Sequence, residues 1–292
     1  MNWVPLLFLD DVCHRLSKPE FNQVSQLSGS WPSFGSEHGE KRRELQFVCQ
    51  VDDQEVNYDL QETDWPYREV TVADLNLEFD RITDFVSDYE YSDHPVSLCE
   101  FERVVLPTVA PLVTNCCWPY LAASAQNRIL FNAFKNCPGF NEITVEEKSE
   151  ESRDFVARQV RLGNVQELNL YGANKWPEAE NLTETLKVFV SSARFHELYS
   201  PDPLIDGCEL FELFLERALA SELKRGARII TPSTNFDKSR FLALRPEYHD
   251  DSRKDEWPTR RHNSERNAWR IPNSNLRITL RHLGAMLYLE VE

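Results

Sequence analysis

The sequence predicts an α/β fold with three parts: a short helical segment at the N-terminus, an irregular α/β solenoid with a curved, largely parallel sheet, and a C-terminal β-hairpin. Three observations carry this prediction. Residues 5–27 place apolar side chains at helical spacing, and residues 126–200 repeat a helix–turn–strand pattern. Residues 276–291 alternate apolar and polar side chains in two runs, as paired strands do.

Two short amphipathic helices are predicted at the N-terminus. The first has one apolar face at positions i, i+3, i+4 and i+7, formed by Leu9, Val12, Cys13 and Leu16, with Leu6 extending the row backwards. The second places Phe21, Val24 and Leu27 inward and ends at Ser28-Gly29-Ser30. A segment this short cannot bury its own apolar face. It therefore packs as a cap on the next domain or against another protein.

Repeated units follow in the middle of the chain. Phe140-Asn141-Glu142-Ile143, Val165-Gln166-Glu167-Leu168 and Phe195-His196-Glu197-Leu198 share one pattern of apolar, polar, glutamate and apolar residues. Each follows a helical run and a short turn, so each is predicted to be a strand. A fourth unit is predicted from Phe211 to Ile230. Units that bury their apolar face only against their neighbours stack into solenoids.

Glutamate recurs at one position of this pattern, as Glu142, Glu167 and Glu197. These side chains are expected to point the same way from successive strands. The column is either the solvated side of a sheet, which is the simpler interpretation, or a binding face. The three glutamates are therefore the candidate substrate-binding residues.

Further strands and loops are predicted around these units. Residues 47–51 and 56–60 alternate on either side of a polar turn and predict an acidic hairpin. Additional strands are predicted at 70–77 and 101–106, and a charged loop at 248–275. The C-terminal hairpin is expected to cover the exposed end of a sheet.

Charge and cysteine usage narrow the class of protein. The formal net charge of −16 opposes the approach of phosphates, so no nucleic-acid partner is expected. The longest apolar runs fall short of a membrane span, so no membrane partner is expected either. Seven scattered cysteines without a C-x-x-C pair are typical of a reducing compartment. The chain is accordingly expected in the cytoplasm, the nucleus or both.

The sequence contains no recognisable catalytic motif. It lacks G-x-S-x-G, a Walker loop, H-E-x-x-H and G-x-G-x-x-G. The seven histidines show no metal-ligand spacing with cysteine. The vicinal pair Cys116-Cys117 could be redox-active, but its position beside Trp118 favours packed core. We therefore expect no enzyme, no cofactor and no metal. A hydrolase-like site assembled only in space is the alternative left open.

The start of the chain resembles the F-box, a short helical motif. The resemblance begins with Val4-Pro5-Leu6-Leu7-Phe8-Leu9-Asp10-Asp11-Val12-Cys13, and the motif ends near Trp31. The repeats behind them resemble degenerate leucine-rich repeats of 20–29 residues. Together with the stretch 155–170, the layout is most similar to the large nematode-expanded group of F-box-like proteins. It differs from the usual motif in two ways: Val4 replaces the leading leucine, and the acidic pair lies further downstream.

This resemblance implies a substrate adaptor of a cullin–RING ubiquitin ligase. Its N-terminal helices would dock on an adaptor of the Skp family, and its repeats would bind a protein substrate. The implied adaptor-binding residues are Val4, Pro5, Leu6, Leu9, Val12 and Leu16. A leucine-rich-repeat-like interaction module without a ligase role is the alternative function.

The sequence thus predicts five segments. They are an F-box-like helical segment (1–42), an acidic hairpin and linker (43–67), a leucine-rich-repeat-like region (68–247), a charged loop (248–275) and a C-terminal hairpin cap (276–292).

Overall fold

The computed structural model describes residues 5–16, 18–51, 55–87, 95–118, 127–146, 149–171, 179–201, 207–232, 243, 248, 266–283 and 286–292. The chain forms two compact units. The N-terminal unit comprises Met1–Tyr120 and Ala125–Asn141, and the C-terminal unit comprises Leu121–Ser124 and Glu142–Glu292. Helices and mixed sheets occur together, which confirms the α/β class. The division does not coincide with the predicted boundaries at 42 and 67.

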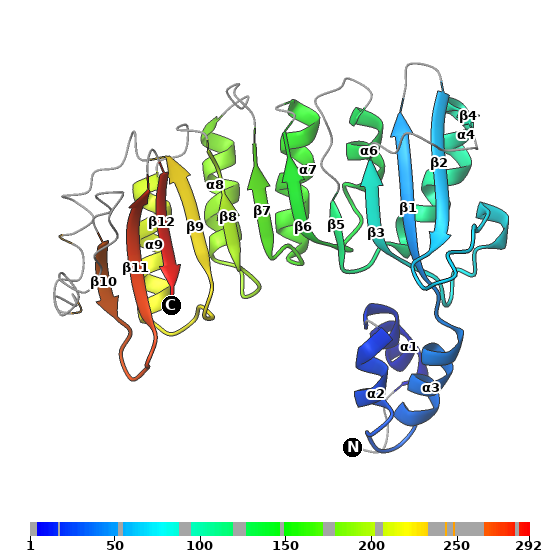
Figure 1. Ribbon diagram of the computed structural model, residues 1–292, viewed down its shortest axis with the longest axis horizontal. Helices are drawn as coiled ribbons and strands as arrows, with labels where there is room; N and C mark the ends of the chain where they lie inside the picture. Colours follow the sequence, from blue (N-terminus) through cyan, green and yellow to red (C-terminus); the bar gives the residue numbers. More distant parts are fainter. Residues whose placement is uncertain are drawn as a thin grey trace. The chain divides into compact units, whose positions relative to one another are not determined.

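The N-terminal unit begins with three helices rather than the two predicted (Figure 1). They are α1 (Leu6–Arg15), α2 (Phe21–Val24), preceded by the short turn η1 (Lys18–Glu20), and α3 (Trp31–Lys41). The sequence pattern did not predict α3, because this helix contains two glycines and glycine is a poor helix former. Gly35 is there for packing: a Cβ added to it would lie 2.9 Å from Cγ1 of Val24.

A four-stranded sheet follows, with the order β3-β1-β2-β4. Its strands are β1 (Glu44–Val51), β2 (Glu55–Glu62), β3 (Arg81–Ser87) and β4 (Pro95–Ser97). The predicted hairpin is confirmed, because β1 and β2 pair antiparallel. The segment 43–67, predicted as an acidic hairpin and linker, contains this hairpin and forms part of a larger sheet. Strand β1 also pairs in parallel with β3, and its Phe47 is fully buried.

The strands predicted at 70–77 and 101–106 are wrong, because the first segment contains one short helical turn and the second lies in a run of short helices. They contain η2 (Val72–Asp74), and the run α4 (Leu98–Glu100), η3 (Phe101–Val105), α5 (Leu106–Val109) and η4 (Ala110–Leu112). Thr71 and Asp74 form a capping box, and the Ser97 hydroxyl accepts from the Glu100 amide at 3.2 Å. Phe101 then stacks on Phe47, with 6.5 Å between ring centroids.

The N-terminal unit ends with an aromatic core around β5 (Cys116–Trp118) and α6 (Asn127–Phe134). Trp118 is 2% exposed and contacts the rings of Phe85, Phe131, Phe134 and Phe140. Of the vicinal cysteines, Cys116 is buried as predicted and Cys117 is exposed, because successive strand residues face opposite sides.

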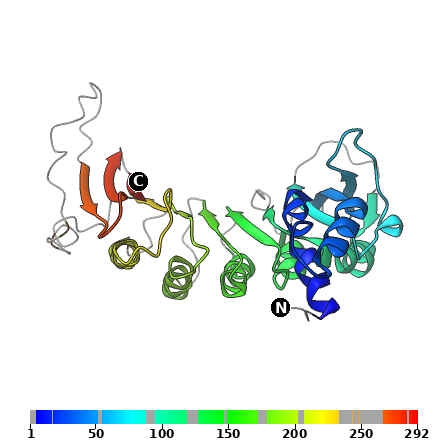
Figure 2. The ribbon, with the colours of Figure 1, turned by 90° about the horizontal axis from the view of Figure 1, so that it is seen from below.

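The C-terminal unit contains the predicted repeats. Strands β6 (Phe140–Val145), β7 (Glu167–Leu170), β8 (Glu197–Tyr199) and β9 (Arg228–Pro232) pair in parallel with their neighbours. Helices α7 (Glu150–Leu162), α8 (Ala179–Val190) and α9 (Gly207–Leu219) connect them. All four predicted strands are therefore confirmed. Figure 2 shows these three helices on the same side of the strands.

The C-terminal hairpin is confirmed as β11 (Arg277–Leu283) and β12 (Met286–Val291), which pair antiparallel. It extends the sheet, because β12 also pairs with β9. A further strand, β10 (Arg266–Arg270), lies inside the segment predicted as a charged loop and pairs with β11. Its Trp269 is fully buried. The sequence did not predict this strand, because charged residues surround the tryptophan.

Candidate functional site

The sheet of the C-terminal unit has one apolar face and one polar face. The apolar face carries Ile143, Leu168, Leu198 and Ile229, which are between 0 and 1% exposed, and helices α7, α8 and α9 lie on a single side of these strands (Figure 2). Neighbouring strand residues alternate between faces. The opposite face therefore carries the glutamates of the repeated pattern, and it is the candidate binding surface. We call it the open face, because the described helices α7, α8 and α9 lie on the other side of the strands.

The predicted glutamate column is present as part of a longer charged row. The strand register aligns Glu142 with Glu167, Glu167 with Glu197, Glu197 with Arg228, and Arg228 with Glu290. These five side chains, here called the charged row, run across β6, β7, β8, β9 and β12. The prediction that the three glutamates occupy equivalent positions on successive strands is confirmed.

One ion pair and one histidine–carboxylate contact organise the middle of the charged row. Arg228 donates to Oε2 of Glu197 from Nε at 2.8 Å and from Nη2 at 2.5 Å. The hydrogen bond to Glu197 raises the pKa of Arg228, and the nearby carboxylates of Glu290 and Glu167 act in the same direction. His196 Nδ1 lies 3.0 Å from Oε1 of Glu167. The sequence reasoning did not select this histidine; only its place beside the repeated glutamate marked it.

Tyrosines lie beside the charged row on the same face. Tyr199 follows Glu197 by two residues and Tyr171 follows Glu167 by four, so each shares a face with its glutamate. The two rings are 5.0 Å apart between centroids. Burial raises the pKa of Tyr199, and the neighbouring Tyr171 and Tyr288 raise it further. The face thus combines carboxylates with aromatic surfaces.

One group of described side chains in this face has the spacing of a metal site. Glu167, His196 and Glu197 each offer a ligand atom, and these atoms lie within 4.8 Å of one another. A divalent ion there would compete with Arg228 for Glu197 and would be repelled by the guanidinium. The group therefore acts first as an ion pair, Arg228 with Glu197, beside a contact between His196 and Glu167.

Helix α1 has an internal face that packs inside the helical segment and an external face that is exposed. Leu9 and Cys13 are 1% and 0% exposed, and they lie one turn apart on the internal face. The guanidinium of Arg42 donates to the carbonyl oxygens of Cys13, at 2.9 Å, and Leu16. Phe8 is 52% exposed, and its ring meets Trp31 edge-on at 6.4 Å.

This geometry corrects one of the implied adaptor-binding residues. Leu9 packs inside the helical segment, so it is not available as an outward contact. Pro5 is exposed, and Val12 and Leu16 are half-buried. Val4 lies outside the described residues, as does the side chain of Leu6. The exposed Phe8, which the sequence reasoning did not select, occupies the outward position next to Leu9.

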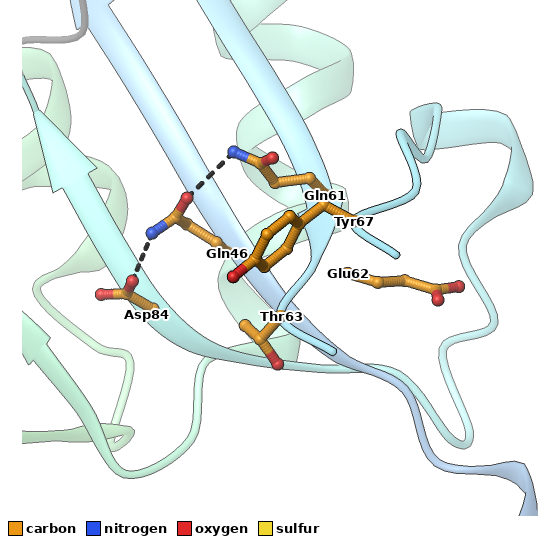
Figure 3. A pocket seen from close by; sticks show the side chains of 6 residues that line it. All are labelled: Gln46, Gln61, Glu62, Thr63, Tyr67 and Asp84. Carbon is orange, nitrogen blue, oxygen red and sulfur yellow. Dashed lines mark hydrogen bonds between the residues drawn. The ribbon is translucent and has the colours of Figure 1, made fainter. Parts of the chain in front are cut away.

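A second polar feature lies on the sheet of the N-terminal unit (Figure 3). A cavity of about 370 Å³ is lined by Gln46, Gln61, Glu62, Thr63, Tyr67 and Asp84. Gln61 donates to Gln46 at 3.0 Å, and Gln46 in turn donates to Asp84, which makes a chain across β2, β1 and β3. In the sequence, Gln61 and Gln46 stand next to the buried Leu60 and Phe47, and this alternation indicates a polar face. Its amides and carboxylates can hydrogen-bond a small polar molecule.

Comparisons with protein-family models, with curated proteins and with solved structures found no match to this chain. Among the described helices, none combines the length and apolar character needed to cross a bilayer. The chain is an α/β protein whose C-terminal sheet has a polar, charged surface. That surface and the N-terminal helices are the features that bear on its function.

Proposed function

We propose that this protein is a non-catalytic substrate-recognition adaptor of a cullin–RING ubiquitin ligase. In this proposal the N-terminal helices dock on an adaptor of the Skp family. The four parallel strands and their helices form an irregular leucine-rich-repeat-like solenoid that binds a protein substrate on its open face. The observation that carries the proposal is the combination, in one chain, of a three-helix segment with one outward aromatic side chain, Phe8, and a sheet covered by helices on one side.

The proposed docking surface centres on Phe8. Pro5, Phe8 and Val12 fall at i, i+3 and i+7 of α1, so they share one side of that helix. Phe8 is 52% exposed, and its ring contacts that of Trp31 edge-on. Large apolar side chains that remain exposed on a protein surface mark sites of protein contact when they cluster. Aromatic anchors also contribute most of the binding energy at such interfaces.

A second function, an interaction module without a ligase role, is favoured by the internal face of α1. Leu9 and Cys13 are buried within the chain. Arg42 and Arg81 both donate to carbonyl oxygens near the end of α1, and Arg81 Nε reaches the His14 oxygen at 3.2 Å. A helix held in this way also serves as a cap. The two functions differ in the role of the external face of α1: a ligase adaptor uses this face to bind a Skp-family protein, and a cap does not.

Capture of a purified Skp-family adaptor by the full-length chain separates these functions. We expect capture at micromolar concentration, and Phe8→Asp should weaken it at least about tenfold because an aromatic anchor is replaced by a charge. Val188→Asp is the matched control, since Val188 is also 52% exposed but lies on α8 of the C-terminal unit. No capture by the wild-type chain would remove the adaptor function and leave the interaction module.

A further inference from the structure

We propose that the cavity on the sheet of the N-terminal unit binds the ring of a neutral carbohydrate. None of the residues that line it belongs to α1 or to the charged row, so the proposal goes beyond the ligase role and does not rest on it. Three features carry it: a bulge that turns a carboxylate to the polar side of the sheet, a chain of hydrogen-bonded amides, and exposed aromatic rings in the neighbouring loop.

A shift in strand register places Asp84 in the cavity. Leu45 of β1 pairs with Ile82 of β3. The next residue of β1, Gln46, pairs with Asp84, so β3 contains one extra residue at this point. Both Ile82 and Phe85 are buried. In a regular strand Asp84 would share the buried face of Ile82, two residues away, and the extra residue turns it to the face of Gln46 instead. Bulges re-aim side chains in this way and are over-represented beside functional sites.

The carboxylate lies at the end of a chain of amides. Nε2 of Gln61 donates to Oε1 of Gln46 at 3.0 Å, and Nε2 of Gln46 donates to Oδ2 of Asp84 (Figure 3). These bonds fix the orientation of both amides. Each amide nitrogen carries a second N–H, and Oε1 of Gln61 and Oδ1 of Asp84 are acceptors. The cavity thus presents donors and acceptors close together in fixed positions.

This mixture of donors and acceptors selects hydroxyl groups. A metal ion or an ammonium group uses only acceptors, whereas one hydroxyl accepts from an amide N–H and donates to a carboxylate. None of the described residues that line the cavity is lysine or arginine, so an anionic ligand would find no countercharge among them. Oε1 of Glu62, the second carboxylate of the lining, lies 3.8 Å from Nη1 of Arg43. A neutral ligand with several hydroxyls therefore fits the lining best.

The loop that follows β2 adds aromatic surface to these polar groups. Tyr67 lines the cavity together with Gln46 and is 66% exposed (Figure 3). Trp65, two residues earlier in the same loop, is 84% exposed. Aromatic side chains normally bury most of their surface, so two exposed ones in a short loop mark a contact site.

A sugar ring matches this combination of surfaces. It carries hydroxyls around its edge and C–H groups on its faces. One face can therefore pack on the Tyr67 ring while the hydroxyls reach Gln61 and Asp84. The cavity volume of about 370 Å³ is near the lower end of the range for ligand pockets, which suits a single sugar unit.

Saturation-transfer NMR on the full-length chain tests the proposal. The probes are the methyl glycosides of glucose, galactose, mannose and N-acetylglucosamine. At least one of them is expected to bind with a Kd of about 5 mM or lower. Asp84→Asn should weaken that binding at least about tenfold, because hydrogen bonds to a charged group are lost, and Gln61→Met about fivefold. Tyr67→Ala should weaken it at least about tenfold, whereas Tyr67→Phe keeps the ring and should stay within about threefold of wild type.

Matched controls lie in the C-terminal unit. Asp154, whose side chain is 71% exposed, and Tyr171, which is 37% exposed, provide Asp154→Asn and Tyr171→Ala. Each should leave the affinity within about twofold of wild type. Equal losses in the cavity variants and in these controls would overturn the proposal. Thermal melting checks the fold of every variant. Tyr67 lies in an exposed loop, so its Ala and Phe variants decide the outcome even if Asp84→Asn unfolds the chain.

Two further results would overturn the proposal. The first is the absence of saturation transfer to all four glycosides at about 20 mM. The second is tighter binding of adenine or cytosine than of every glycoside, with the same dependence on Asp84 and Tyr67. These flat rings carry no hydroxyls, so that result would assign the cavity to a nucleobase. Neither result bears on capture of the Skp-family adaptor, which is tested through Phe8.

Discussion

Arg42 donates from Nη2 to the carbonyl oxygen of Cys13 at 2.9 Å, which fixes the last turn of α1 to the residue that ends α3. Carbonyl groups in the last turn of a helix have no partner within the helix, so a buried guanidinium is an effective donor to them. Burial lowers the pKa of Arg42 to about 10, and the nearby charge of Arg81 adds to this effect. The contact of the guanidinium with the Phe21 ring, at 4.8 Å, completes its surroundings.

Replacing Arg42 by Met is expected to loosen the helical segment. The change removes hydrogen bonds from a charged group to buried carbonyl oxygens, which are worth about 1.5–3 kcal/mol. Hydrogen exchange of the α1 amides should accelerate, while the amides of β7 and β8 in the other unit keep their protection. Lys41→Met is the control, because Lys41 is exposed and contacts Glu37 at 2.7 Å and the Phe79 ring. Equal acceleration in both variants would contradict this role of Arg42.

Two glycines give opposite predictions for the same substitution. A Cβ on Gly139 would lie 2.1 Å from the carbonyl oxygen of Val113, so Gly139→Ala forces the backbone apart and should destabilise the N-terminal unit by several kcal/mol. A Cβ on Gly39 would meet Phe21 at 3.6 Å, an ordinary contact within α3. Gly39→Ala should therefore be neutral or stabilise by up to about 1 kcal/mol. Chemical denaturation of the two variants measures this contrast, and similar effects would contradict it.

The repeated units were predictable because their signal is local and repeated. The pattern ending at Ile143, Leu168 and Leu198 fixes which residues are buried, and the burial of one face fixes the register of parallel strands. The register in turn aligns the glutamates. Helix α3 and strand β10 were not predictable in the same way. Gly35 and Trp269 serve contacts with distant residues, and neither contact leaves a periodic trace in the sequence.

The candidate site was predictable only in part, for a related reason. Repetition revealed Glu142, Glu167 and Glu197, but their partners come from residues that break the repeat. Arg228 replaces glutamate in the fourth unit, and His196 reaches Glu167 from the position just before β8. In α1, helical periodicity placed Leu9 on an apolar face correctly, yet it could not say whether that face turns inward. The structure shows that it does.

Buried thiols predict a loss of stability at alkaline pH. Burial raises the pKa of Cys137 to about 11, and it also raises the pKa values of Cys49 and Cys116. An unfolded thiol titrates near about 8.5, so the unfolded chain releases these protons first. Their contribution to stability is complete below about pH 8.5 and declines as the pH rises toward 11. Urea unfolding between about pH 7.5 and 10.5 should show this decline.

The same thiols should be protected from modification. Cys99 and Cys117 are exposed and should react with a disulfide reagent at about pH 8, whereas Cys49, Cys116 and Cys137 should react only after unfolding. The variant Cys99→Ser/Cys117→Ser should lose the rapid reaction of these two thiols and keep the alkaline decline in stability. Rapid labelling of Cys49 or Cys116 in the folded chain would contradict the assignment of these residues to the core.

Arg228 is expected to suppress metal binding by the open face. Its guanidinium occupies an oxygen of Glu197 that would otherwise join Glu167 and His196 as a zinc ligand. Arg228→Met removes this competitor and its repulsion, so zinc affinity should rise about tenfold or more. Calorimetric titration in a Cys99→Ser/Cys117→Ser background avoids binding by these two exposed thiols. Adding His196→Gln should reverse the gain, since a ligand nitrogen is lost. A gain that survives His196→Gln, or wild-type affinity equal to that of Arg228→Met, would show that Arg228 does not control this group.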